Sequence, residues 1–247
     1  MNEYINLTLD NIDSEHICCA IGDPKHNFGV NAKKEWLKER IKEGHVFRKL
    51  NAQGKVFIEY APLEKAWVPI EGDNYLYIYC LWVAGSFKGK GYGKELLDYA
   101  ISDAKKNNKN GICVISSKKK KPFISEKGFF THYGFKVVDT VDDYELLALS
   151  FNDKLPKISD YAKNMKINSK KVTIYYSNEC PYVENCIKEI TDYSSSNNVN
   201  IDIIKIDSLK KAKEVPCIFN NWAVFVNGEF ISNTLLNKNS FVKLINK

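Results

Sequence analysis

The sequence lacks any long apolar run, and this absence limits what the protein can be. No stretch approaches the roughly 18 consecutive apolar residues of a membrane-spanning helix. The first residues also lack the basic and apolar segments of a secretory signal peptide. We therefore expect a cytoplasmic protein without a membrane partner. At 247 residues, of which 44% are hydrophobic, the chain is long enough for one large globular domain or two modest ones.

The sequence lacks a paired cysteine framework, and arginine is far rarer than lysine. The seven cysteines are odd in number and scattered, which is not typical of a secreted disulfide framework. His16 with Cys18 and Cys19 is short of a zinc set, so we expect no metal. The lysine bias indicates an AT-rich bacterial genome. The net charge is only +6, and no helix carries a basic stripe, so we expect no nucleic-acid partner.

The strongest pattern lies between residues 75 and 107. Tyr75–Val83 is an unbroken aromatic and aliphatic run, which predicts a buried strand. A glycine-rich cationic loop, residues 88–94, follows it, and apolar residues at helical spacing come next. Glycines let backbone N–H groups converge, and a helix N-terminus carries about half a positive charge. This order of strand, loop and helix predicts a binding site for phosphate groups.

The spacing within the loop distinguishes among phosphate-binding families. A Walker loop requires Ser or Thr after its lysine, and neither follows Lys94. A dinucleotide fingerprint requires an acidic residue about 20 residues on, whereas the strand 112–116 runs into serine and lysines. The pattern Lys88-x-x-Gly91-x-Gly93 resembles the pyrophosphate loop of the GNAT N-acetyltransferases. The resemblance implies an α/β fold, with a mixed twisted sheet flanked by helices, and acetyl-CoA as cofactor.

The resemblance also implies where the cofactor lies. Its pyrophosphate would lie on the loop backbone and its pantetheine along the end of the preceding strand. The reaction would be direct attack of an amine on the thioester, without a covalent enzyme intermediate. The cofactor-binding residues expected on this basis are Leu81, Trp82, Val83, Lys88, Gly89, Lys90, Gly91, Tyr92, Gly93, Lys94 and Phe129.

A second segment, residues 129–135, departs from the family pattern. It resembles the GNAT sequence Phe-Tyr-x-x-x-Gly-Phe, in which the tyrosine hydroxyl protonates the departing thiolate. Matching its final Gly-Phe places Phe130 at the tyrosine position, and phenylalanine has no proton to give. Tyr133, His132 or solvent would then act as the acid. A non-catalytic acyl-CoA-binding or thiol-responsive protein is the alternative that this departure keeps open.

The acceptor side is predicted around the connection 62–70, whose two prolines and tryptophan indicate a shaped loop. The resemblance implies that the amine approaches from this side of the sheet. Glu59, Glu64 and Trp67 are therefore candidates for holding or deprotonating it. The alternative is that Trp67 packs in a core and both glutamates are solvated. A small amine, an amino acid and a peptide all remain possible acceptors, and the oligomeric state stays open.

Other elements follow from local signals. Asn31 is a good N-cap for a helix that ends at Gly44, and Ser125 is a candidate cap for a helix running to Tyr133. Strands at 45–50 and 55–61 flank a hairpin turn.

The region after residue 151 predicts a linker and a second domain. Residues 152–170 are polar and proline-containing, between a GNAT domain at 1–151 and a domain at 171–247. The pattern of residues 171–247 predicts a strand, a helix, a strand, a proline, a hairpin and a helix in that order. This order resembles the thioredoxin fold. The whole chain resembles two-domain proteins in which a GNAT domain carries a C-terminal YoaP-like domain.

The cysteines of this second domain are the last candidates. Cys180 occupies the place of the thioredoxin redox site, and Pro216 that of its cis-proline. A dithiol needs C-x-x-C, and Val183 stands at the second position. Cys180 and Cys217 are therefore a possible thiol site, with Cys180 expected to begin a helix and to be the more reactive. The alternative is that these thiols are unreactive parts of a structural module.

Overall fold

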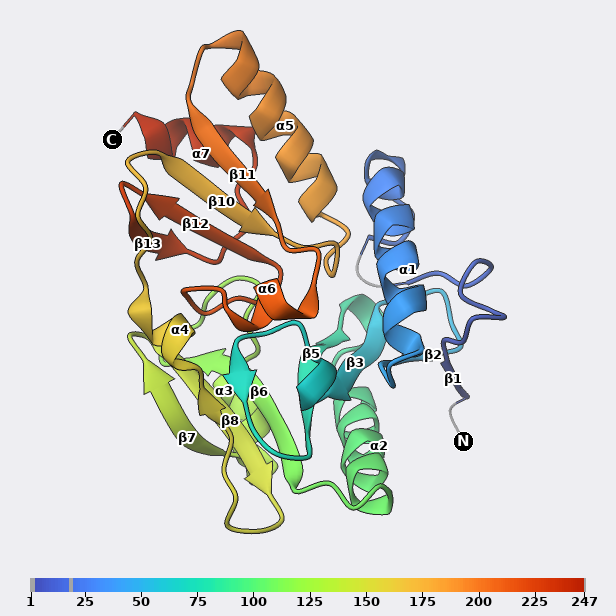
Figure 1. The fold of residues 1–247 in the computed structure, drawn as a ribbon. Helices are drawn as coiled ribbons and strands as arrows, with labels where there is room; N and C mark the ends of the chain where they lie inside the picture. The colour runs from blue at the N-terminus through green and yellow to red at the C-terminus, as the bar shows by residue number, and fades with distance from the viewer. Residues whose placement is uncertain (1–2, 18–19, 247) are drawn as a thin grey trace. The chain divides into compact units, whose positions relative to one another are not determined.

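The computed structural model describes residues 3–17 and 20–246, so Cys18 and Cys19 lie outside the described residues. The chain forms two compact units (Figure 1). The N-terminal unit comprises Met1–Ile21, Leu37–Ala66 and Ile70–Ile158. The C-terminal unit comprises Gly22–Trp36, Trp67–Pro69 and Ser159–Lys247. Two short segments from the first third of the sequence thus complete the C-terminal unit.

The N-terminal unit is built on a seven-stranded mixed sheet in the order β1-β2-β3-β5-β6-β8-β7. Only β5 and β6 pair in parallel, and the other neighbours are antiparallel. A small second sheet pairs β4 with β9. The strands are β1 Tyr4–Asn6, β2 Val46–Leu50, β3 Val56–Pro62, β4 Ile70–Glu71, β5 Tyr75–Val83, β6 Gly111–Ser117, β7 Lys136–Val141, β8 Tyr144–Ser150 and β9 Lys157–Ile158.

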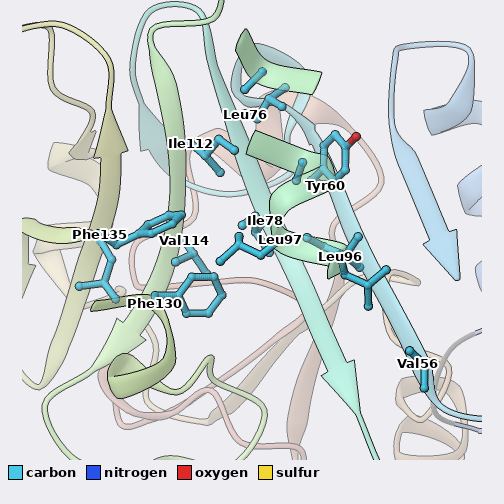
Figure 2. Packing of buried hydrophobic residues seen from close by; sticks show 14 of the residues in the cluster. Val56, Tyr60, Leu76, Ile78, Leu96, Leu97, Ile112, Val114, Phe130 and Phe135 are labelled. Atoms are coloured by element: carbon cyan, nitrogen blue, oxygen red, sulfur yellow. The ribbon is translucent and has the colours of Figure 1, made fainter. Parts of the chain in front are cut away.

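Helix α2, Tyr92–Lys106, covers one face of this sheet. Its apolar stripe buries Leu96, Leu97, Ala100 and Ala104, as the sequence spacing predicts. These side chains pack against alternate residues of the central strands and against α3, Lys127–His132 (Figure 2). The predicted mixed α/β sheet with flanking helices is confirmed. The α3 N-cap is Glu126 rather than the expected Ser125, which instead forms a parallel bridge with β6.

Helix α1, Asn27–Ile41, begins earlier than the expected cap at Asn31. A 3-10 turn, η1 (Pro24–His26), precedes it, and the Asp23 side chain accepts a hydrogen bond from the Lys25 backbone N–H at 3.1 Å. An aspartate cap followed by proline at the first helical position is a strong start signal. It overrides Asn31, which lies inside the helix.

The C-terminal unit contains a four-stranded sheet in the order β11-β10-β12-β13. Strands β10 and β11 are parallel, and β12 runs antiparallel to β10 and to β13. One apolar cluster holds α5 and α7 against the sheet, and another gathers around the segment after β11. The elements are α4 Asp160–Asn164, β10 Val172–Tyr176, α5 Val183–Ser196, β11 Ile201–Lys205, α6 Leu209–Lys213, β12 Trp222–Val226, β13 Glu229–Ser232 and α7 Lys238–Ile245.

The segment expected to be a linker, residues 152–170, contains β9 and α4, and the boundary between the two units falls between Ile158 and Ser159. Across the part of the chain that the structure describes, no helix is long and apolar enough to cross a membrane.

Candidate active site

Strands β5 and β6 are paired over only part of their lengths. Their parallel ladder joins Tyr75–Tyr77 to Gly111–Cys113 and then ends. Strand β5 continues to Val83 with β3 as its partner, and β6 continues with β8. The facing edges of β5 from Ile78 to Val83 and of β6 from Val114 to Ile115, here termed the open ladder, are therefore not paired with each other. Backbone groups on such an edge can pair with an extended ligand.

A β-bulge lies beside the open ladder. The register between β3 and β5 shifts between Glu59 and Tyr60, so that Glu59 pairs with Cys80 and Tyr60 with Ile78. Tyr79 is the extra residue on β5. A bulge changes which side chains share a face. Leu81 and Val83 consequently point to the α2 side of the sheet, along with Ile78.

The glycine-rich loop leads from the end of β5 into α2. Gly91 is the N-cap of α2 with φ 85°, and Gly89 has φ 74°, both in the left-handed region that favours glycine. A glycine cap has no side chain to satisfy the first N–H groups of the helix, so these groups point outward. A Cβ placed on Gly89 or Gly91 meets nothing within 4 Å. The space above the loop is thus open to a ligand.

The lysines of the loop differ in their surroundings. Lys88 and Lys90 are exposed, and neither forms an ion pair within the described residues. Lys94 instead pairs with Asp98 one turn along α2. The hydrogen bond and the charge of Asp98 raise the Lys94 pKa, with a smaller contribution from Tyr133. Two of the three predicted lysines are therefore available to a phosphate, and the third is already paired.

Aromatic side chains fix the shape of the loop. The short 3-10 turn η3, Gly85–Phe87, brings the Phe87 ring over Gly54 in the hairpin between β2 and β3. The Phe87 ring also packs edge-on against Tyr92, with ring centroids 5.8 Å apart.

Helix α3 supplies two aromatic residues at the N-terminus of α2. The nearest atoms to a Cβ built on Gly93 are those of the Phe129 ring, at 3.3 Å, with Leu81 at 3.8 Å. Tyr133 packs against Phe129, with ring centroids 5.0 Å apart. The structure therefore brings Phe129, Tyr133, Leu81 and the glycine loop together.

Phe130 lies elsewhere. It is 2% exposed and packs in the core against Phe135, with ring centroids 5.2 Å apart (Figure 2). The residue at the family's tyrosine position is thus a core residue here. The tyrosine that packs against Phe129 beside the loop is Tyr133, the C-cap of α3.

Glu59 points to the opposite face of the sheet, because Val56, Ile58 and Tyr60 alternate with it and point toward α2. It is completely buried there. Its Oε1 lies 3.0 Å from Nε2 of His45. The sequence suggested Glu59 as a candidate and missed His45, since nothing in the local pattern pairs them. The only available signal was a charged residue at a core-facing position of a strand.

The remaining acceptor-side candidates have structural contacts. Glu64, in the 3-10 turn η2 (Leu63–Lys65), is exposed and accepts a hydrogen bond from the Asn74 backbone N–H at 2.5 Å. Trp67 is 6% exposed and packs edge-on against Trp36 in the C-terminal unit. Neither of these contacts involves Glu59.

The C-terminal cysteines are buried in different apolar clusters. Cys180 packs with α5 and α7, and Cys217 packs with the other cluster. Helix α5 begins at Val183, so the expectation that Cys180 begins the helix is wrong; the turn closed by the Val183 N–H and the Cys180 carbonyl comes first. The expected cis bond before Pro216 is also wrong, since every peptide bond in the described chain is trans.

Burial raises the pKa of two thiols in the C-terminal unit. It raises the pKa of Cys217 well above its ordinary value and that of Cys186 to about 11. None of the five described cysteines is in a disulfide. Within residues 3–17 and 20–246, no group of three His, Cys, Asp or Glu side chains is arranged to hold a metal.

Comparison with known proteins identifies the family. Residues 13–135 match the model of the acetyltransferase (GNAT) family, and residues 200–243 match that of YoaP-like proteins. The chain is 41% identical over 246 residues to a Bacillus subtilis protein described as "uncharacterized N-acetyltransferase YoaP", covering 98% of both chains. The chain belongs to the GNAT acetyltransferase family. It carries a YoaP-like C-terminal region and is, as a GNAT protein, an acyltransferase.

Solved structures of GNAT proteins are also similar to this chain. PaiA N-acetyltransferase from Thermoplasma acidophilum, solved with coenzyme A, is 16% identical with a TM-score of 0.44. It matches 61% of this chain and 99% of its own. A GNAT acetyltransferase from Staphylococcus aureus Mu50 is 19% identical with a TM-score of 0.44, matching 62% of this chain and all of its own.

Proposed function

We propose that the protein transfers the acetyl group of acetyl-CoA to an amine, which is a small molecule, an amino acid or a peptide. One observation carries this proposal: the open ladder and the glycine-capped N-terminus of α2 both lie at the end of β5. In acetyl-CoA an extended pantetheine chain is attached to a pyrophosphate, and binding both parts requires these two features next to each other. Acetyl-CoA supplies the activated acetyl group as a thioester, which the amine attacks directly.

The cofactor-binding residues follow from this arrangement. Backbone N–H groups from Gly89 to Lys94 would bind the pyrophosphate, because the helix dipole and the open space above the glycines both favour an anion. Exposed Lys88 and Lys90 would add charge-assisted hydrogen bonds. The β5 edge of the open ladder would pair with the amides of the pantetheine.

The catalytic groups would come from both faces of the sheet. Tyr133 would donate a proton to the leaving thiolate, since it borders the loop beside Phe129. Backbone N–H groups near the bulge would hold the negative charge that develops on the thioester oxygen. Glu59 would accept the proton of the amine. Glu64 and Trp67 would act indirectly, by shaping the connection between β3 and β4.

The C-terminal unit would have a thioredoxin-like fold. This is supported by its order of elements, which is strand, helix, strand, short helix, hairpin and helix. The burial of Cys217 and the absence of a second cysteine at residue 183 favour a structural module over a redox enzyme.

The test is release of free CoA thiol from acetyl-CoA in the presence of a panel of amines, amino acids and peptides. Mass spectrometry of the acceptor would check for an added acetyl group. Turnover that depends on one amine class supports the proposal. Acetyl-CoA binding without turnover on any class would favour the non-catalytic binding protein instead.

A further inference from the structure

A buried acid–base pair lies on the face of the sheet opposite α2. The Nε2 of His45 is 3.0 Å from Oε1 of Glu59, and the two side chains are 1% and 0% exposed. Burying an ionised carboxylate costs several kcal/mol unless a partner compensates it. His45 lies directly before β2 and Glu59 in the middle of β3, so the hairpin between these strands brings the partners together.

The pair lies at the bulge. Glu59 is the cross-strand partner of Cys80, and the ring of the bulged residue, Tyr79, is 5.1 Å from the ring of His45. The ladder between β5 and β6 ends at Tyr77, two residues earlier. Glu59 is therefore on the strand next to β5, and neighbouring strands lie about 4.8 Å apart. This spacing separates the strand backbones, so the proton of the amine would reach the buried carboxylate through water rather than by direct contact.

We propose that His45 is the positioning residue that keeps the carboxylate of Glu59 ionised and oriented to take the proton of the acceptor amine. This inference rests on the proposed transferase function. In the step, an N–H bond of the ammonium breaks, an O–H bond forms on Glu59, and the electron pair stays on nitrogen for attack. His45 donates its Nε2–H to the carboxylate before the transfer. It does not touch the substrate.

Several other groups must be considered in a pH experiment. Tyr77 packs edge-on against Tyr79, and the His45 backbone N–H donates to the carbonyl of Arg40. Tyr79, Cys80 and Arg40 border the pair through ring contact, strand pairing and this backbone bond. Tyr77 and Glu43 lie one contact further out, against Tyr79 and Arg40.

The test compares pH profiles of kcat in the full-length protein and three variants. His45→Gln keeps an N–H donor but cannot carry a charge, and Glu59→Gln cannot accept the proton. The matched control is Glu71→Gln, since the Glu71 side chain forms an exposed ion pair with Lys157 at 3.1 Å. Acetyl-CoA affinity and melting temperature are measured for each protein, to separate chemistry from folding.

Removing the imidazole weakens support for the ionised carboxylate, so the acidic limb of the His45→Gln profile should move to higher pH by about 1 unit or more. Its kcat should fall at least about 10-fold at pH 7 and recover at high pH. Glu59→Gln should lose about 100-fold or more at every pH, and Glu71→Gln should match wild type. A purely structural pair would lower the melting temperature and leave the acidic limb unmoved, which would overturn the proposal.

A second measurement separates this inference from the proposed function. If wild type acetylates no amine, the function fails, and the pair is judged by NMR titration of the His45 ring. Loss of the neighbouring anion in Glu59→Gln should lower the titration midpoint of His45 by about 1 unit or more. An unchanged midpoint would show that the two groups are not coupled and would overturn the inference by itself.

Discussion

The ring of Phe87 lies directly over Gly54: a Cβ on Gly54 would be 2.3 Å from Cε2 of that ring. The contact joins the hairpin between β2 and β3 to the turn that precedes the glycine-rich loop. Because only glycine leaves room for the ring, residue 54 helps to set the position of residues 88–94.

We therefore predict that Gly54→Ala weakens acetyl-CoA binding by several-fold, because Phe87 must shift and the loop must follow. Calorimetric titration would measure the affinity. Gly128→Ala, where a Cβ meets nothing within 4 Å, is the matched control and should keep wild-type affinity. Equal affinities in both variants would show that the Phe87 contact does not position the loop.

The loop lysines should differ in importance. Lys88→Ala removes an exposed, unpaired charge and should weaken acetyl-CoA binding by roughly 1 to 3 kcal/mol, as expected for a charge-assisted hydrogen bond. Lys94→Ala should cost less, because Lys94 is already paired with Asp98. Binding measured at two salt concentrations checks this order, and a larger loss in Lys94→Ala would contradict it.

Two aromatic substitutions in the α3 region test the acid. Tyr133→Phe should lower kcat by roughly 100-fold or more if its hydroxyl protonates the thiolate, without changing acetyl-CoA affinity. Since Phe130 falls at the family's tyrosine position in the sequence match, Phe130→Tyr would on that ground alone keep or raise activity. The structure changes that expectation, because a hydroxyl at this buried position costs about 1 to 3 kcal/mol of stability. Wild-type turnover in Tyr133→Phe at every pH would exclude Tyr133.

A buried ion pair in the C-terminal unit should matter more than an exposed one. Lys33 and Glu179 lie 3.7 Å apart with side chains 3% and 5% exposed, and Asn221 donates to Glu179 at 2.9 Å. Lys33→Met leaves a buried carboxylate and should cost about 3 to 5 kcal/mol of unfolding free energy. Lys25→Met, which breaks an exposed pair with Glu189, should cost much less, because solvent screens that pair. Similar urea midpoints for the two variants would contradict this.

The thiol of Cys186 should make stability depend on pH. Burial raises its folded pKa from 9.0 to about 11. The unfolded chain therefore ionises first as the pH rises, and stability is lost between about pH 9 and 11. At 1.36 kcal/mol per unit, the loss is about 2 to 3 kcal/mol. Cys186→Ala should reduce the difference in unfolding free energy between pH 8 and 11 by that amount, and an unchanged difference would show that the thiol is not involved.

The sequence predicted what local patterns determine. The strand Tyr75–Val83 has the predicted bounds, because an apolar run between turn residues leaves little choice. The helix after the loop follows from its spacing. The start of α1 was misplaced because Asn31 and Asp23 are both good caps, and the proline after Asp23 decides between them.

Long-range relationships were not predictable in the same way. The end of the ladder at Tyr77, the bulge at Tyr79 and the His45–Glu59 pair depend on the register of three strands, which no local pattern fixes. Trp67 was read as an acceptor-side residue, yet it lies in the core of the C-terminal unit. The other buried residues of its cluster, from Ile206 to Phe225, lie more than 100 positions away in the sequence.

The central claim is that acetyl-CoA binds on the glycine cap of α2, and calorimetric titration of wild type and Gly91→Val tests it most directly. A β-branched residue is strained at φ 85° and projects into the open space above the loop. With circular dichroism confirming that both proteins are folded, we predict saturable binding to wild type and none to Gly91→Val. Equal acetyl-CoA affinity in the two proteins would contradict the account.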